Sequence, residues 1–145
     1  MRCSWRFRDK EQGKSKKVKG KNGAKRPRDI KERTFRFALE ILRLCKELDE
    51  RPDVGRTLGK QLLRSGTSIG ANAEEAQAGQ SKADFVSKYA IALKEARETL
   101  YWLRLLKESG SLRDGSIDMV IQEADELSRI IGSIIVKAKQ GSDDT

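Results

Sequence analysis

The chain of 145 residues contains no histidine, and this absence removes several catalytic and metal-binding arrangements. Without histidine there is no His general base, no Ser–His or Cys–His nucleophile pair, no His-ligated zinc and no Glu-x-x-His di-iron pattern. The two cysteines, Cys3 and Cys45, are too few and too far apart for a disulfide framework or a Cys-rich metal site. We therefore expect no metal, no cofactor and no enzymatic activity.

Long apolar runs and prolines are also scarce. No stretch of about 18 apolar residues exists, so we expect no helix that spans a membrane. The basic start of the chain, Met1 to Lys10, lacks the apolar segment of a secretory signal, and we expect a cytoplasmic protein. With only Pro27 and Pro52, most of the chain is free to be helical.

Positive charge is concentrated before Pro27. The chain has 31 basic and 22 acidic residues; residues 1–28 contain twelve of the basic and two of the acidic ones, a net charge of +10. The remaining positions, 29–145, therefore carry 19 basic and 20 acidic residues, a net charge of −1. Because Val18 is the only larger apolar residue between Gln12 and Lys25, burial cannot offset the entropy of folding there. We predict a disordered basic tail over 1–28, a folded domain over 29–140 and a short C-terminal tail over 141–145.

From Asp29 onward, apolar residues recur at the three- and four-residue spacing of helices. The predicted helices run from a cap at Asp29 to Pro52, from a cap at Asp53 towards Ser81, from Ser81 to about Glu108, and over 116–139. The first helix contains two apolar series, one through Phe37 and one through Phe35 and Leu42. We interpret them together as one broad buried face. Four amphipathic helices with short connections predict an all-α fold, an antiparallel up-and-down four-helix bundle.

The third predicted helix is apolar on more than one side, which a helix of an isolated bundle does not need. Ile91, Trp102 and Leu105 turn away from the main apolar face of this helix. We interpret them as an oligomer interface and predict a homo-oligomer.

Two groups of basic residues are candidates for nucleic-acid binding. A basic disordered segment binds polyanions through counterion release, and a row of basic residues on a helix can follow phosphates. The candidates in the tail are Lys14, Lys16, Lys17, Lys19, Lys21, Lys25, Arg26 and Arg28, and those on the second helix are Arg56, Lys60 and Arg64. For the helical row the alternatives are a solvated face or salt bridges to other helices; for the tail, a solubilising extension.

The segment from Ser65 to Gly70 is rich in small residues. It lacks the strand and the Lys-Ser/Thr pair of a phosphate loop, so we interpret it as a close approach of helices, beneath Tyr101 or Trp102. Ser65 and Asn72 are interpreted as a buried polar network, with a small-molecule or catalytic site beside Glu75 or Glu98 as the alternative.

The same region resembles a known family. The stretches that carry the resemblance are QLLRSGTSIGAN at 61–72, EA at 75–76, SKADF at 81–85, ALKEA at 92–96 and ETLYWL at 98–103. They are similar to the bacterial four-helix-bundle proteins associated with intervening sequences of 23S rRNA genes, over residues 30–139. The resemblance implies an up-and-down bundle and a ring-like homopentamer. A similar fold serves as the accessory protein of diversity-generating retroelements, which acts with a reverse transcriptase and RNA. The basic tail precedes the usual start of the family.

Two functional hypotheses follow. The first is a non-enzymatic, homo-oligomeric protein that associates with RNA, or with an RNA-containing complex, through phosphate contacts. The second is a structural or adaptor module that binds a protein partner, such as a nucleic-acid-processing protein, with no direct role for nucleic acid.

Overall fold

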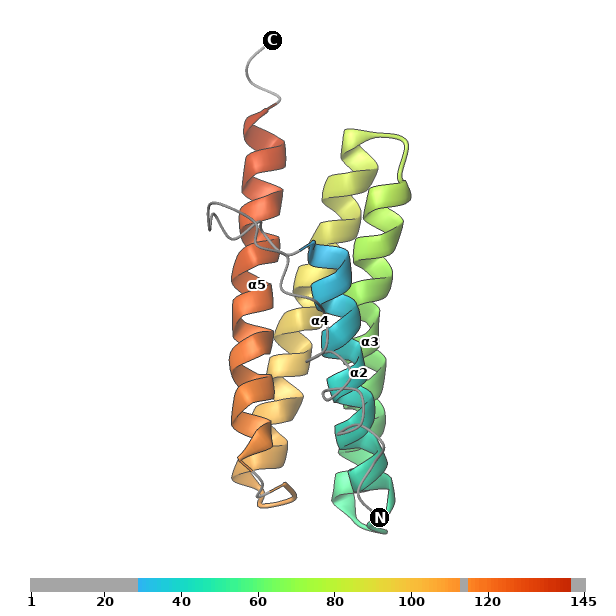
Figure 1. Cartoon of the computed structure of the whole chain (residues 1–145), viewed down its shortest axis with the longest axis vertical. Coiled ribbons are helices and arrows are strands. Elements are labelled where there is room, and N and C mark those ends of the chain that lie inside the picture. Colours follow the sequence, from blue (N-terminus) through green and yellow to red (C-terminus); the bar gives the residue numbers. More distant parts are fainter. Residues whose placement is uncertain (1–28, 113–114, 142–145) are drawn as a thin grey trace, which may run out of the picture.

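The computed structural model describes residues 29–112 and 115–141, and within these ranges the regular structure is helical. Four helices run alternately down and up the long axis of the molecule (Figure 1). Their bounds are Ile30–Asp49 for α2, Val54–Ala78 for α3, Lys82–Glu108 for α4 and Ser116–Gln140 for α5. The predicted all-α four-helix bundle is thus confirmed, whereas the predicted basic tail, residues 1–28, lies outside the described residues.

The helices begin and end where local chemistry requires. The carboxylate of Asp29 accepts the backbone N–H of Lys31 at 3.1 Å, and that of Asp53 accepts the N–H of Gly55 at 2.8 Å. The hydroxyl of Ser81 accepts the N–H of Asp84 at 3.1 Å. Beyond the end of α4, Gly110 has a φ of 74°, the left-handed conformation that glycine adopts without strain. The predicted caps at Asp29, Asp53 and Ser81 are therefore confirmed.

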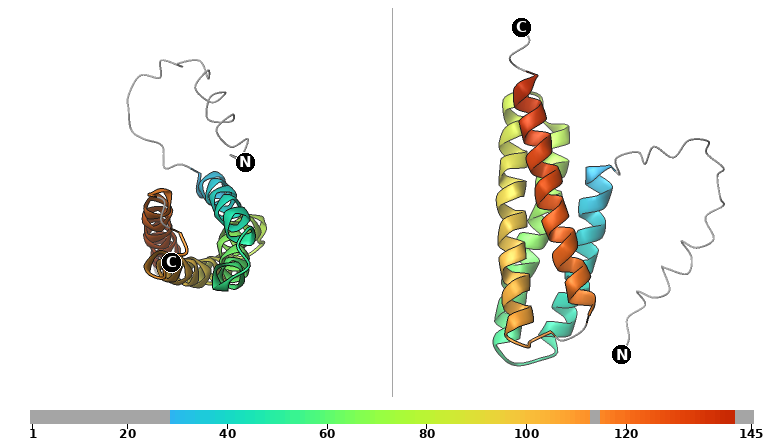
Figure 2. Two further views of the ribbon diagram at one scale, coloured as in Figure 1. Left: turned by 90° about the horizontal axis from the view of Figure 1, so that it is seen from below. Right: turned by 90° about the vertical axis from the view of Figure 1, so that its left-hand side faces the viewer.

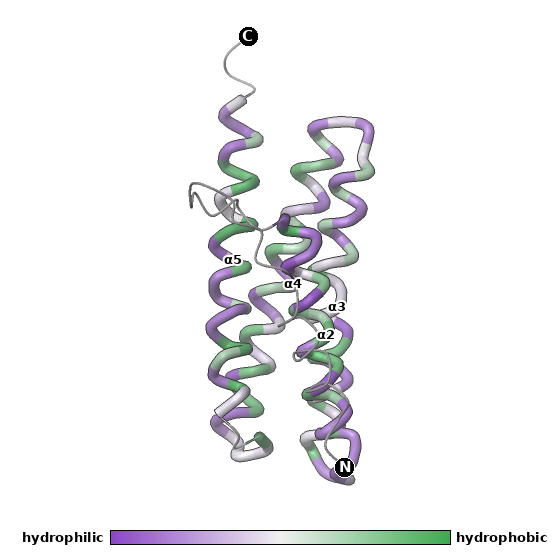
Figure 3. Tube along the Cα trace, in the orientation of Figure 1, coloured by the Kyte–Doolittle hydropathy of each residue, from purple (hydrophilic) through white to green (hydrophobic). Residues whose placement is uncertain are grey.

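Each helix contributes an apolar stripe to one core. In Figure 3 hydrophobic and hydrophilic stretches alternate along the helices, as expected for helices with one buried face. The largest core side chains are fully buried: Phe37, Ile41, Leu44, Leu48, Leu62, Ile69, Tyr89, Leu103, Leu106, Leu127 and Ile131. At the end of the bundle that α2 does not reach, the ring of Phe85 packs edge-on against Tyr89, with ring centroids 4.7 Å apart.

The four helices form an open arc. Seen along the bundle, α3 and α4 form the base and α2 and α5 the two ends, with an opening between α2 and α5 (Figure 2). Neighbouring helices pack extensively, whereas α2 and α5 approach each other at few positions. The bundle thus closes least completely between α2 and α5.

One prediction about α2 is wrong. The series through Phe37 is buried, but Phe35 and Leu42 are 62% and 38% exposed rather than part of the same buried face. The reason is the arc: α2 packs closely against α3 alone, so a single stripe suffices to fill the contact. An apolar strip therefore remains on the outer side of α2.

Candidate functional site

A groove lies between α2 and α3 near their connection, formed by the second half of α2 and the first half of α3, on the outer side of the bundle. Its volume is about 330 Å³. The floor is mainly apolar, and basic side chains line it from both helices. The lining residues are Leu42, Cys45, Lys46, Asp49, Arg56, Gly59, Lys60 and Leu63. Two of the three basic residues predicted on the second helix, Arg56 and Lys60, belong to this groove.

Arg56 is held by the end of α2. Its guanidinium donates to the backbone carbonyl of Asp49 at 2.6 and 3.1 Å, and its Nε lies 3.5 Å from the carboxylate of the same residue. These contacts tie the start of α3 to the last turn of α2. Arg56 therefore has a structural role in joining the two helices.

Arg64 turns away from the groove towards α4. Its guanidinium donates to the carboxylates of Glu98 and Glu95, the latter at 3.4 Å. The hydrogen bond from Arg64 lowers the pKa of Glu98, and desolvation opposes this shift only in part. The predicted row is therefore divided: Arg56 and Arg64 pair with groups of neighbouring helices, while Lys60 has no ion pair within residues 29–112 and 115–141.

Lys46 is a further basic residue of the groove that the sequence pattern did not indicate. It lies on α2 and lines the groove together with Lys60 of α3. No ion pair joins it to an acid in the described part of the chain. In the sequence, Lys46 is simply a lysine on the polar side of a helix. That it lies close to Lys60 follows only from the packing of α2 against α3.

Cys45 is half-buried in the wall of the groove. Its thiol donates to the backbone carbonyl of Gly59 at 3.2 Å. Burial raises the pKa of the thiol to about 11, so the group is neutral near pH 7 and is a poor nucleophile there. A catalytic role for this cysteine is not supported by its surroundings.

The glycine-rich stretch of α3 does make a close helix contact, but with a different neighbour than predicted. A Cβ added to Gly66 would lie 2.8 Å from Cγ1 of Ile41, and one added to Gly70 would lie 3.3 Å from the hydroxyl oxygen of Thr34. Both contacts are with α2, so these glycines lie on the side of α3 that faces α2. The expectation that they lie beneath Tyr101 or Trp102 is wrong.

One polar residue of this stretch, Ser65, makes a buried hydrogen bond to a neighbouring helix. Ser65 is fully buried, and its hydroxyl accepts a hydrogen bond from Thr99 of α4 at 2.9 Å. Asn72 donates to the carbonyl of Ser68 one turn earlier. Glu75 instead pairs with Lys88 at 2.6 Å. The interpretation as a buried polar contact therefore holds for Ser65, which bonds across the α3–α4 contact, but not for Asn72, which is partly exposed and bonds within its own helix.

The predicted oligomer interface lies on the outer side of α4. Ile91 and Leu105 are 39% and 37% exposed, and Tyr101 beside them is 56% exposed. Trp102 is half-buried; its indole N–H donates to Glu98 at 3.2 Å, and its ring meets that of Tyr101 at a centroid distance of 5.2 Å. Trp102 follows Ile91 by eleven residues, about three helical turns, and Leu105 follows Trp102 by three, so the three residues share one face of α4. The apolar surface predicted for α4 is present, and Tyr101 extends it.

The remaining predicted residues cannot be placed. The candidates from Lys14 to Arg28 lie outside the described residues. Among the residues that are described, no group of three or more acidic or cysteine side chains could hold a metal ion, and no helix is long and apolar enough to cross a membrane.

Comparison with known proteins identifies the family. The model of the 23S rRNA-intervening sequence protein matches residues 27–133. A solved structure of a protein of unknown function from the S23 ribosomal protein family of Bacteroides thetaiotaomicron is 42% identical, with a TM-score of 0.68. The match covers 73% of this chain and 97% of that one. No curated protein matches the chain. With more than half of its length matched by the family model, the chain belongs to the 23S rRNA-intervening sequence protein family.

Proposed function

We propose that this protein is a non-enzymatic, self-associating helical-bundle protein of the cytoplasm that associates with RNA through phosphate contacts. The observation that carries the proposal is the distribution of charge. Residues 1–28 carry a net charge of +10, whereas residues 29–145 carry −1. Such a basic segment binds polyanions without sequence readout, because neutralising phosphates releases their counterions.

The bundle supports this division of roles. Many of its basic residues, including Arg33, Arg43 and Arg64, form ion pairs with acidic residues of the bundle. Lys46 and Lys60 at the α2–α3 groove are exceptions. The basic segment is therefore expected to supply most of the attraction to RNA, and the groove a smaller, local part.

Self-association rests on the outer side of α4. Ile91, Tyr101 and Leu105 leave apolar area in water that a second subunit would cover. Several subunits would also bring several basic segments to one RNA molecule, which raises the effective concentration of each. The resemblance to ring-like relatives makes a pentamer the expected assembly.

Deleting residues 1–28 tests the proposal. The intact chain should bind RNA of unrelated sequences, with affinity falling steeply between roughly 50 and 200 mM salt. The protein of residues 29–145 should keep its helical circular dichroism and its assembly but bind weakly. A matched control is the intact chain with Lys137→Gln and Lys139→Gln, two exposed cations of α5, which should bind almost as wild type. Equal binding by the truncated protein would contradict the proposed role of the basic segment.

The adaptor hypothesis is favoured by one specific observation. The largest exposed aromatic side chain of α4, Tyr101, adjoins an apolar face that would suit a protein partner as well as a second subunit. If purified protein carries no nucleic acid, shows no salt-sensitive binding to RNA and stays monomeric, an adaptor that uses this face is the better proposal.

A further inference from the structure

The α2–α3 groove combines two chemical properties that a nucleotide matches. Leu42, Leu63 and Gly59 give it an apolar floor, and Lys46 and Lys60 contribute ammonium groups from the two helices. The lining contains three cations and one carboxylate, that of Asp49, so its net charge is +2. Its ligand should therefore have an apolar, flat part and a negative group close by.

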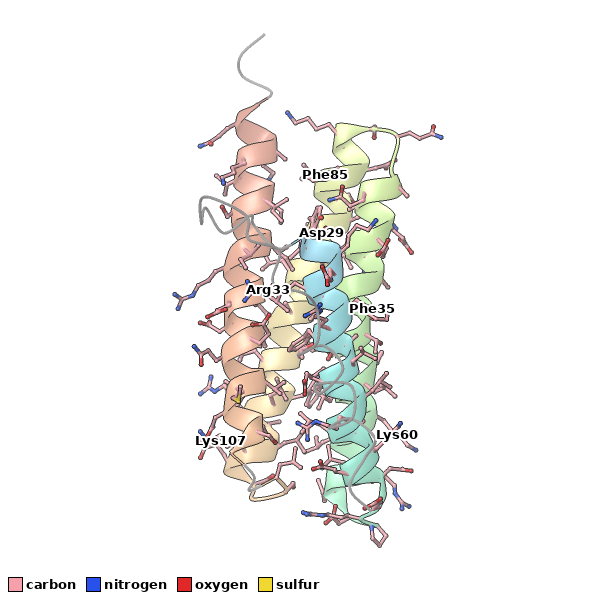
Figure 4. All side chains as sticks on the ribbon, viewed as in Figure 1. Asp29, Arg33, Phe35, Lys60, Phe85 and Lys107 are labelled. Carbon is pink, nitrogen blue, oxygen red and sulfur yellow. The ribbon has the colours of Figure 1, made fainter. Side chains whose placement is uncertain are left out.

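The two lysines are available for a ligand. Arg56 is engaged with Asp49, which neutralises the single acid of the groove. Lys46 and Lys60 form no ion pair in the described part of the chain, and Lys60 is exposed on the outer side of the bundle (Figure 4). An ammonium group without an acidic partner keeps its full attraction for a phosphate.

The apolar floor continues along α2 to an aromatic side chain. Phe35 precedes Leu42 by seven residues, two helical turns or about 10 Å, and so lies on the same side of α2. Its ring is 62% exposed, and Figure 4 shows it on the same side of the molecule as Lys60. A basic groove beside an exposed aromatic ring is the combination that binds single-stranded nucleic acid, in which phosphates meet cations and bases stack on rings.

We propose that the α2–α3 groove binds single-stranded RNA, with phosphates at Lys46 and Lys60 and unpaired bases on the apolar strip from Leu63 and Leu42 to Phe35. The inference rests on the proposed function and adds the form of RNA that is recognised. In a duplex the bases are paired and stacked with one another, so mainly phosphates and sugars are accessible to such a strip. The groove therefore favours single strands, whereas the basic segment attracts both forms.

Substitution of the lysines tests the phosphate contacts. Full-length Lys46→Gln/Lys60→Gln is compared with Lys137→Gln/Lys139→Gln, which removes the same charge from exposed positions of α5. Each single-strand phosphate contact contributes about 0.7 to the slope of log affinity against log salt, so the groove variant should lower the slope for an oligouridylate by about 1.4. The control variant should leave the slope unchanged. An equal slope for both variants would overturn the proposal.

Phe35→Ala tests the stacking separately. Loss of one stacked base should weaken binding of the oligouridylate at least about fivefold, while the salt slope and the affinity for a duplex of equal length stay as in wild type. Because Phe35 is exposed, the variant should fold normally, which circular dichroism verifies. Unchanged affinity, or an equal loss for the duplex, would contradict base stacking at this site.

Cys45 provides a local probe of occupancy. In a Cys3→Ser background it is the only thiol, and its rate of alkylation by iodoacetamide at pH 9 reports access to the groove. A saturating oligouridylate should slow alkylation several-fold, and a duplex should not.

If the intact protein binds oligouridylate without protecting Cys45, the groove proposal fails while the proposed function stands. If alkylation without RNA slows as protein concentration rises, a second subunit occupies the groove, and the proposal is wrong. If neither RNA binds, the proposed function itself fails.

Discussion

At the scale of single residues, glycines determine how closely α3 approaches α2. Gly59 lies against Leu48, Gly66 against Ile41 and Gly70 against Thr34. Ile41 is fully buried and branched at Cβ, so it cannot rotate away from an added methyl group. Helix-breaking residues are tolerated here because a closer helix contact offsets their lower helix propensity.

Gly66→Ala should therefore destabilise the protein by about 1–2 kcal/mol, although alanine is the better helix former by about 1 kcal/mol. The clash of the new Cβ with Ile41, at 2.8 Å in the present geometry, is the reason. Urea denaturation followed by circular dichroism measures the change. Gly132→Ala is the matched control: nothing lies within 4 Å of its added Cβ, so it should stabilise by about 0.5–1 kcal/mol. Stabilisation by both substitutions would show that the glycine contact is not tight.

The thiol of Cys45 makes a second prediction at this scale. Burial raises its pKa from 9.0 to about 11, so the folded state favours the neutral thiol. This contribution to stability is fully present below pH 9 and is lost as the pH rises towards 11. In the Cys3→Ser protein, the rate of alkylation should reach half of its maximum near pH 11. The same protein unfolded in urea should reach it near pH 9, and coinciding profiles would show that burial does not perturb the thiol.

At the scale of helices, Arg33 joins the two ends of the arc. Its guanidinium donates to both carboxylate oxygens of Glu123 on α5, at 2.6 and 2.9 Å, and also to Glu126. These hydrogen bonds raise the pKa of Arg33 above its usual value, against the opposing effect of burial. Because α2 and α5 otherwise approach at few positions, this cluster is a main link between the two ends of the arc.

Arg33→Gln should cost about 1–3 kcal/mol, since it removes charged hydrogen bonds and leaves two carboxylates close together. Hydrogen exchange should accelerate in the first turns of α2 and remain unchanged in the middle of α3 and α4. Arg36→Gln is the control, because among the described residues Arg36 pairs with Glu32 of its own helix alone, and both are exposed. That variant should cost about 0.5 kcal/mol or less. Similar effects of both variants would argue against a clasp between α2 and α5.

At the scale of the whole molecule, we predict that the outer side of α4 forms the contact between subunits. Light scattering at micromolar concentration should give a mass several times the 16.4 kDa of one chain. Ile91→Asp places a charge in the apolar face and should dissociate the subunits while circular dichroism and melting remain those of a folded bundle. Met119→Asp is the control, because Met119 is an exposed apolar residue of α5 rather than of α4. A monomeric wild type, or dissociation by both variants, would contradict the assignment of the interface.

Much of the fold could be predicted from the sequence, but less of the site. The capping residues and the buried series through Phe37 act within one helix, and sequence patterns report them well. The partners of Arg56 and Arg64 come from other helices, so the sequence allowed such salt bridges as an alternative but could not identify the acids. Lys46 was missed for the same reason, because its relation to Lys60 depends on how α2 and α3 are aligned.

The sequence by itself determined the four helices, their ends, the absence of histidine chemistry and the placement of nearly all net charge before Pro27, because these properties are local or compositional. Only the tertiary structure decided that the helices form an open arc and that Arg33 bridges its ends. It also decided that the glycines face α2 and that two lysines share a groove. These features depend on the angles and register between helices. Contacts between residues distant in sequence set those angles and that register, and no single helix encodes them.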